Sequence, residues 1–219
     1  MKNTILWLLT LTIFTSCNKE EKKTIEKEFS IAEKIANAHG FENWNKVSKI
    51  AFTFNVDKDS SHFERSWTWK PKTNAITLIS NQDTINYNRK TLDSISLKAD
   101  QSFINDKFWL LIPFQLVWDS GTTFSEATKE KAPISETLLN KITLTYSNEG
   151  GYTPGDAYDI FYDDAFIIQE WIFRKGNSKA PSLITSFQNT KDFNGLKIAT
   201  EHLKKEGKWN LNFTNIEIE

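Results

Sequence analysis

Short runs of alternating apolar and polar residues recur along the sequence from residue 50 onward, and they constrain the fold more than any other feature. In the first run, IAFTFNV (Ile50–Val56), Phe52 and Phe54 share one face of a strand. Turn-forming residues such as Asp163-Asp164 and Gly207 separate the later runs. Strands at this spacing are typical of meandering antiparallel sheets. The sequence therefore predicts a mainly β (α+β) fold built on a single, strongly curved antiparallel sheet.

The first two runs are predicted to form a hairpin. HFERSWTWK (His62–Lys70) places Trp67 and Trp69 on one face together with Arg65, and the polar link DKDSS (Asp57–Ser61) joins it to the first run. The remaining predicted strands are Ala75–Ser80, Asp83–Asn88, Lys141–Ser147, Ala157–Asp163, Phe166–Phe173, Ser182–Gln188, Leu196–Leu203 and Lys208–Ile218.

Two segments are predicted to cover this sheet. In Thr24–His39, apolar residues recur at helical spacing and Gly40 stands where a left-handed cap belongs, which predicts an amphipathic helix. The segment FWLLIPFQLVW (Phe108–Trp118) is the most apolar after the N-terminus, and Pro113 would break a straight helix or a central strand. We therefore expect a bent helix or a strand pair there, serving either as core or as the wall of a ligand cavity. No boundary between domains is evident within residues 24–219.

The N-terminal residues point to export and lipid attachment. Lys2 and the apolar run ILWLLTLTIF (Ile5–Phe14) have the form of a signal peptide, and this run is too short to span a bilayer. The only cysteine, Cys17, follows small residues and resembles the lipobox cysteine of bacterial lipoproteins. The resemblance implies a signal peptide over residues 1–16, a lipid on Cys17 and a charged tether over residues 17–23.

This lipid would attach the protein to the cell envelope, and we expect the outer membrane. The run Cys17 to Glu21 resembles a surface-export signal, so we expect the protein either on the periplasmic face or at the cell surface. A simple signal peptide with an incidental cysteine is the alternative.

No motif for a cofactor, a metal or a catalytic nucleophile is evident in the sequence. The 27 basic and 28 acidic side chains give a net charge of −1, which provides little electrostatic support for nucleic-acid binding. His39, His62 and His202 lie far apart in the sequence, without a metal-ligand spacing. We therefore predict no catalytic residue, no metal site and no cofactor.

Acidic residues nevertheless gather around one predicted hairpin, where a glycosidase pair or a calcium site is conceivable. We favour turn formation for Asp163-Asp164 and solvent-facing positions for Asp156 and Glu170. A hydrolase that uses these acids is therefore the third hypothesis for function.

Aromatic residues are the more informative feature, since 13% of the chain is Phe, Trp or Tyr. If they share the concave face of the sheet, they form either a plain core or the wall of an apolar cavity. Arg65 among them is compatible with a ligand headgroup or with cation–π packing. The candidate cavity residues are Phe52, Phe54, Arg65, Trp67, Trp69, Trp109, Phe114, Trp171 and Trp209.

Several segments together resemble a known family. They are AHGFENW (Ala38–Trp44), WLLIPF (Trp109–Phe114), YDIFYDD (Tyr158–Asp164), NGLKIAT (Asn194–Thr200) and KWNLNF (Lys208–Phe213). With the lipobox, this order resembles bacterial lipoproteins related to the carriers and receptors of the Lol lipoprotein-sorting system. The resemblance implies a half-barrel closed by helices, with a cavity for lipid or lipoprotein acyl chains. A non-catalytic lipid-binding protein is the leading hypothesis, and a structural or protein-interaction lipoprotein with a self-filled core is the alternative.

Overall fold

The structure is a computed structural model that describes residues 28–81, 83–149 and 154–219. The predicted signal peptide (1–16), Cys17, the tether (17–23) and the first residues of the predicted helix (24–27) lie outside the described residues. Within the described ranges, none of the helices combines the length and the apolarity needed to cross a bilayer.

The fold is mainly β, as predicted, but the strands divide between two antiparallel sheets. One sheet has seven strands in the order β11-β12-β13-β1-β2-β3-β4. The other has the path β10-β9-β8-β7-β5, with β6 paired to β7. The strands of the first sheet are β1 (Ile50–Lys58), β2 (Ser61–Lys70), β3 (Ala75–Ser80), β4 (Asp83–Asn88), β11 (Gln188–Phe193), β12 (Leu196–Leu203) and β13 (Trp209–Ile218). Those of the second are β5 (Thr122–Phe124), β6 (Thr128–Lys131), β7 (Leu138–Tyr146), β8 (Ala157–Tyr162), β9 (Ile168–Arg174) and β10 (Leu183–Ser186).

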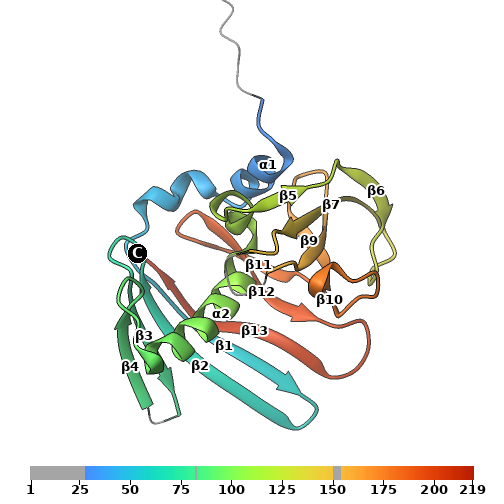
Figure 1. Cartoon of the computed structure of the whole chain (residues 1–219). Helices are drawn as coiled ribbons and strands as arrows, with labels where there is room; N and C mark the ends of the chain where they lie inside the picture. Colours follow the sequence, from blue (N-terminus) through green and yellow to red (C-terminus); the bar gives the residue numbers. More distant parts are fainter. Residues whose placement is uncertain (1–27, 82, 150–153) are drawn as a thin grey trace, which may run out of the picture.

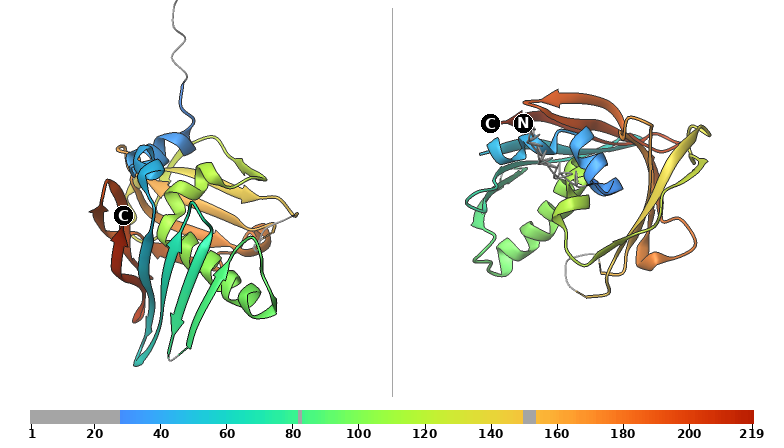
Figure 2. Two further views of the ribbon diagram at one scale, coloured as in Figure 1. Left: turned by 90° about the vertical axis from the view of Figure 1, so that its left-hand side faces the viewer. Right: turned by 90° about the horizontal axis from the view of Figure 1, so that it is seen from above.

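The two sheets adjoin at Phe187, where the chain leaves β10 and enters β11 of the other sheet. The Ser186 hydroxyl accepts a hydrogen bond from Leu203 N (3.2 Å) and so ties β10 to β12. The predicted strand Ser182–Gln188 therefore contains β10 and ends at the first residue of β11. Both sheets curve around one long helix, α2 (Ser94–Trp118), which lies between them (Figures 1 and 2).

The helix α2 is bent, which selects one of the two predicted structures for Phe108–Trp118. Pro113 lies inside it, and Leu111 has a non-helical backbone (φ −122°, ψ 25°). Proline lacks the N–H that would bond to the carbonyl four residues earlier, and its ring crowds that turn, so the helix bends there. The helix also begins at Ser94, much earlier than predicted, with Asp93 and Ser96 forming a capping box.

The N-terminal helix is shorter than predicted. It runs over α1 (Ile31–Ala38), and its N-cap Ser30 forms a capping box with Glu33. Phe29, which falls within the predicted helix Thr24–His39, precedes the helix and is 50% exposed. Gly40 ends the helix with φ 91°, as predicted, and a Cβ atom there would lie 1.9 Å from Gly195 O. Glycine therefore permits both the turn and the close approach to the β11–β12 hairpin.

Candidate functional site: an aromatic cavity beside the central helix

An apolar cavity of about 490 Å³ lies between α2 and the six-stranded sheet. On the helix side its lining residues are Gln101, Ile104, Asn105, Phe108 and Trp109. Residues 101, 104, 105 and 108 are spaced by three or four positions, so they occupy one face of α2. The two amides are exposed, Ile104 and Phe108 are half-buried, and Trp109 is buried. The helix therefore presents apolar side chains to the interior and amides toward solvent.

Strand register assembles the opposite wall. Tyr158 of β8 pairs with Phe173 of β9, and Phe173 pairs with Leu183 of β10, so these three side chains lie in a row across three strands. Trp171 lies two residues before Phe173 on the same face of β9 and completes this wall. The sheet side is therefore almost wholly aromatic.

The rings of the two walls contact one another. Phe108 lies 4.9 Å from Tyr158 and 5.9 Å from Trp171, centroid to centroid. Trp109 meets Trp171 edge to face at 4.5 Å, and Tyr158 stacks on Phe173 at 5.0 Å. Such pairs stabilise the walls beyond simple area burial. Rings on the helix and rings on the sheet therefore pack against one another at the border of the cavity.

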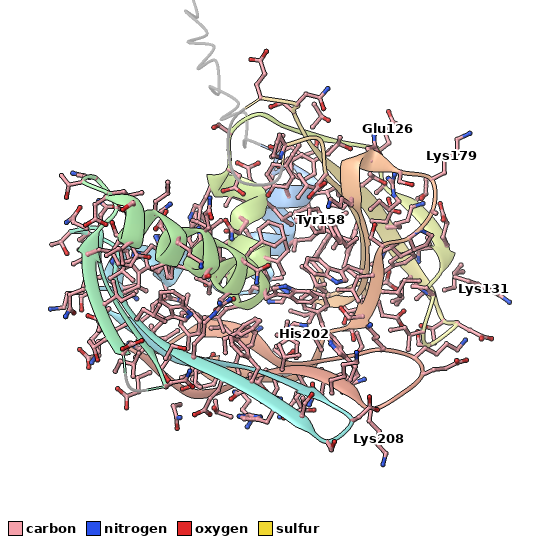
Figure 3. The ribbon with its side chains drawn as sticks, turned by 60° about the horizontal axis from the view of Figure 1, so that its bottom comes forward. Glu126, Lys131, Tyr158, Lys179, His202 and Lys208 are labelled. Atoms are coloured by element: carbon pink, nitrogen blue, oxygen red, sulfur yellow. The ribbon has the colours of Figure 1, made fainter. Side chains whose placement is uncertain are left out.

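Tyr158 brings the one hydroxyl group of the cavity wall. The Tyr158 side chain is 5% exposed and lies in the interior between α2 and the sheet (Figure 3). Its hydroxyl has no hydrogen-bond partner among the described residues, whereas the neighbouring Tyr146 hydroxyl donates to Asp119 Oδ2 (2.7 Å). Burial, with the nearby carboxylates of Asp156 and Asp119, raises the pKa of Tyr158. Tyr158 is therefore a neutral hydrogen-bond donor at physiological pH.

Of the candidate residues predicted from the sequence, Trp109 and Trp171 line this cavity. Phe52, Phe54, Trp67, Trp69 and Phe114 do not line it; they are buried in contacts with other side chains. Phe103 of α2 packs edge to face on Trp67 (5.4 Å) and Trp69 (5.5 Å). This aromatic face of the seven-stranded sheet is therefore core, because the helix fills it.

The remaining members of that set have partners of their own. Phe52 and Phe54 each meet Phe213 edge to face, at 5.9 and 5.8 Å. Phe114 stacks on Phe41 at 6.0 Å. Trp209 is half-buried, with the Lys204 ammonium 5.0 Å from its ring.

Arg65 does not line the cavity either. Its Nε and Nη2 donate to the two oxygens of Asp106 at 2.5 and 2.6 Å, and Trp67 Nε1 donates to Asp106 Oδ2 at 2.8 Å. The guanidinium also lies 5.4 Å from the Phe54 ring and 5.3 Å from the Phe63 ring. Of the two predicted roles for Arg65, the structure shows cation–π packing, together with an ion pair to a fully buried carboxylate.

The sequence-based prediction missed most of the cavity wall: Gln101, Ile104, Asn105, Phe108, Tyr158, Phe173 and Leu183. The signal was present in part, since residues 101, 104 and 108 recur at helical spacing. However, the amides Gln101 and Asn105 lie on that same face, and the charged residues Asp100, Asp106 and Lys107 elsewhere on the helix obscure the apolar spacing.

The acidic group around β8 and β9 serves the backbone. Glu170 accepts hydrogen bonds from Ile134 N (2.7 Å) and Ser135 N (2.8 Å), and Asp156 accepts from Gly176 N (2.7 Å). Both carboxylates are buried, so the predicted solvent-facing positions are wrong: the loops that they cap fold over them.

Asp163 forms a turn, as predicted, by accepting from Ala165 N and Ile167 N, both at 2.9 Å. Within the three described ranges, no cluster of three or more His, Asp or Glu has the arrangement of a metal site.

His39 connects the two sheets. Its Nδ1 donates to Lys197 O of β12 (2.9 Å), and its Nε2 accepts from Ile168 N of β9 (3.2 Å). Burial lowers the pKa of His39 to about 4, and burial lowers that of His202 to about 3. Both histidines are therefore neutral structural groups at neutral pH.

No protein-family model and no curated protein matches this sequence. Among solved structures, the chain is similar to the crystal structure of a DUF1329 family protein from Desulfovibrio piger ATCC 29098. The TM-score is 0.48 and the sequence identity is 6%, over 86% of this chain and 92% of that chain.

Proposed function

We propose that the protein is a non-catalytic, lipid-anchored protein of the cell envelope that binds an apolar ligand, such as an acyl chain, in the cavity beside α2. The observation that supports binding is the aromatic wall around about 490 Å³ of space. This volume lies in the range of small-molecule sites, about 300–1,000 Å³. Transfer of an apolar chain into it would be favoured by roughly 25 cal/mol for each Å² removed from water.

The sequence is the basis for proposing the lipid anchor and the location. A thioether-linked diacylglyceryl group and an acyl chain on Cys17 would hold the protein on a membrane stably, since two or more chains suffice. We expect the outer membrane, on its periplasmic face or at the cell surface.

We also propose that residues 24–219 form one domain related to the half-barrels of the Lol system. A single cluster of buried side chains includes residues from both sheets, α1 and α2, which supports one shared core. The curved sheets around a helix, with an apolar cavity beside it, support the relationship.

A cavity-filling variant tests ligand binding. Ile104→Trp places an indole into the space from a half-buried position on α2. Ile95→Trp, at a 66% exposed site in the first turn of the same helix, is the matched control. The full-length proteins are purified from membranes in mild detergent, and non-covalent lipids are extracted and measured by mass spectrometry. Binding of an apolar fluorescent probe is measured on the same samples.

We expect Ile104→Trp to reduce bound lipid or probe at least tenfold, and the control to match the wild type. Equal binding by Ile104→Trp, or no lipid and no probe on the folded wild type, would overturn the proposal. The latter result would favour the alternative, a structural or protein-interaction lipoprotein with a self-filled core. The filled face of the seven-stranded sheet agrees with that alternative.

Labelling with palmitate tests the anchor separately. The wild type should incorporate the label and fractionate with membranes, whereas Cys17→Ser should incorporate none. Label that persists in Cys17→Ser would contradict the lipoprotein assignment.

A further inference from the structure

The cavity wall is uncharged. Its polar groups are the amides of Gln101 and Asn105, the hydroxyl of Tyr158 and the indole N–H groups of Trp109 and Trp171; the rest of the wall is aromatic or aliphatic. Lys131, Lys179 and Lys208 project from the outside of the molecule (Figure 3). Nothing in this wall would compensate a charge carried by a ligand.

Two basic groups next to the cavity residues are engaged in ion pairs. Arg174 follows the cavity residue Phe173, and its Nε donates to Asp159 Oδ2 (2.9 Å). On α2, the Asp106 carboxylate beside Asn105 holds Arg65. Burial raises the pKa of Tyr158, and the carboxylates of Asp156 and Asp119 raise it further. The two guanidinium groups are therefore not available to a ligand, and two carboxylates act on the Tyr158 side of the cavity.

The polar groups suit a neutral partner. Asn105 Nδ2 donates to Asp106 Oδ1 (3.0 Å), which leaves its carbonyl oxygen free to accept. The Tyr158 hydroxyl can donate to a ligand oxygen, since no described residue accepts from it. The indole Nε1 of Trp171, which also lines the cavity, is buried with no hydrogen-bond partner among the described residues. An unused buried donor is uncommon in proteins, and a ligand or water oxygen would satisfy it.

We propose that the cavity selects neutral ligands, with a hydroxyl, ester or amide group beside Tyr158, over ligands of the same chain length that end in a carboxylate. The proposal rests on the function proposed above and specifies the ligand of that same cavity. Its physical basis is that an ionised carboxylate loses much hydration on entry and meets no cation in the cavity wall. A neutral oxygen loses less hydration and can accept the same hydrogen bond from Tyr158.

A competition experiment tests this selectivity. The full-length protein is transferred from detergent to amphipol and loaded with 1-N-phenylnaphthylamine, a neutral apolar dye. Dodecanol, methyl dodecanoate and dodecanoate then compete at pH 8, where the acid is ionised. We expect both neutral compounds to displace the dye at concentrations at least tenfold lower than dodecanoate.

Two substitutions of opposite charge at the exposed residue Gln101 test the electrostatic part of this selectivity. Gln101→Lys adds a cation at the cavity and should narrow the difference between dodecanol and dodecanoate at least threefold, whereas Gln101→Glu should widen it. Tyr158→Phe should weaken the binding of dodecanol and of methyl dodecanoate several-fold, because both lose the hydrogen bond from the hydroxyl. Ile95→Trp should alter neither competitor.

The outcomes distinguish this inference from the proposed function. Displacement by dodecanoate as effective as that by dodecanol would overturn neutral selectivity, while binding in the cavity would stand. Failure of the dye and of all competitors to bind, or dye binding that Ile104→Trp leaves unchanged, would overturn the proposed function itself.

Discussion

The two sides of α2 meet similar side chains but differ in how closely they pack. Toward the seven-stranded sheet, Phe103 is fully buried between Trp67 and Trp69. Toward the six-stranded sheet, Phe108 is half-buried and borders open space with Trp171. Aromatic composition alone therefore does not decide whether a face of this fold becomes core or cavity.

Buried polar contacts account for the difference. Asp106 of α2 binds Arg65 of β2, and Asp100 of α2 binds Arg89 just after β4 (Nε to Oδ1, 2.8 Å). Both pairs draw the N-terminal half of the helix onto the seven-stranded sheet. On the other side, the polar tie lies at the C-terminal end of α2, where Tyr146 donates to Asp119. The helix is thus fixed along one sheet and spaced from the other.

Removal of one of these carboxylates should lower the free energy of unfolding more than the other substitutions proposed for this comparison. Asp106→Ala leaves the Arg65 guanidinium and the Trp67 N–H without their acceptor in the core. We expect a loss of about 3–5 kcal/mol in the free energy of unfolding, because a half-removed buried pair leaves an uncompensated charge. Urea denaturation measures this.

Glu136→Ala is the control for Asp106→Ala, since it removes an exposed ion pair with Lys205 and should leave the unfolding midpoint unchanged. Equal midpoints for the two variants would mean that the Asp106 pair does not hold the helix.

Two phenylalanine deletions compare the sides directly. Phe103→Ala empties a fully buried position and should cost about 3–5 kcal/mol in unfolding free energy. Phe173→Ala enlarges a space that already exists at a half-buried position, so we expect less than half of that loss. Thermal and urea unfolding check both values. Similar losses at both positions would contradict the distinction between a filled and an open side.

The strands of the seven-stranded sheet were the most predictable part of the fold. Ala75–Ser80, Asp83–Asn88 and Leu196–Leu203 have the predicted bounds. The exposed strands β6 and β11 were missed, because their side chains carry little or no alternation of apolar and polar residues. Alternation reports burial on one face, so a strand with both faces in solvent gives no such signal.

The helix and the cavity depend on information that is not local. Asp100 and Asp106 of α2 are buried, although acidic residues in a helix usually indicate a solvent-exposed surface. Their ion pairs with Arg89 and Arg65, which lie outside the helix, explain the burial. Trp109 and Trp171 were predicted as cavity residues on aromatic character. The space beside them, however, is set by the distance between α2 and a sheet, and no local pattern encodes that distance.

A pH titration sharpens the comparison where the two sheets meet. His39 has a pKa of about 4 in the folded protein, against 6.5 for the free side chain. Between these values the unfolded chain binds the additional proton, so the stability present above pH 6.5 is lost as the pH falls toward 4. The expected slope is about 1.4 kcal/mol per pH unit for His39. His202 contributes in the same direction down to about pH 3.

Urea denaturation at pH 7.5 and pH 5.5 measures this slope. His39→Gln should be less stable at pH 7.5, because it replaces the contacts to Lys197 O and Ile168 N, and its stability should depend less on pH. An unchanged pH dependence would show that His39 accepts a proton while the two sheets stay joined.

The smallest expected effect concerns two neighbouring tyrosines, whose rings lie 6.1 Å apart. Tyr146→Phe removes the hydrogen bond to Asp119 and should cost about 1–3 kcal/mol, because a carboxylate loses its donor. Tyr158→Phe should change the unfolding free energy by less than about 0.5 kcal/mol, since its hydroxyl has no partner among the described residues. Urea denaturation without added lipid measures both. If Tyr158→Phe costs as much as Tyr146→Phe, the Tyr158 hydroxyl already serves the fold. It would then have no donor to offer a ligand, and the amides and indole N–H groups would be the polar groups left on the open side of α2.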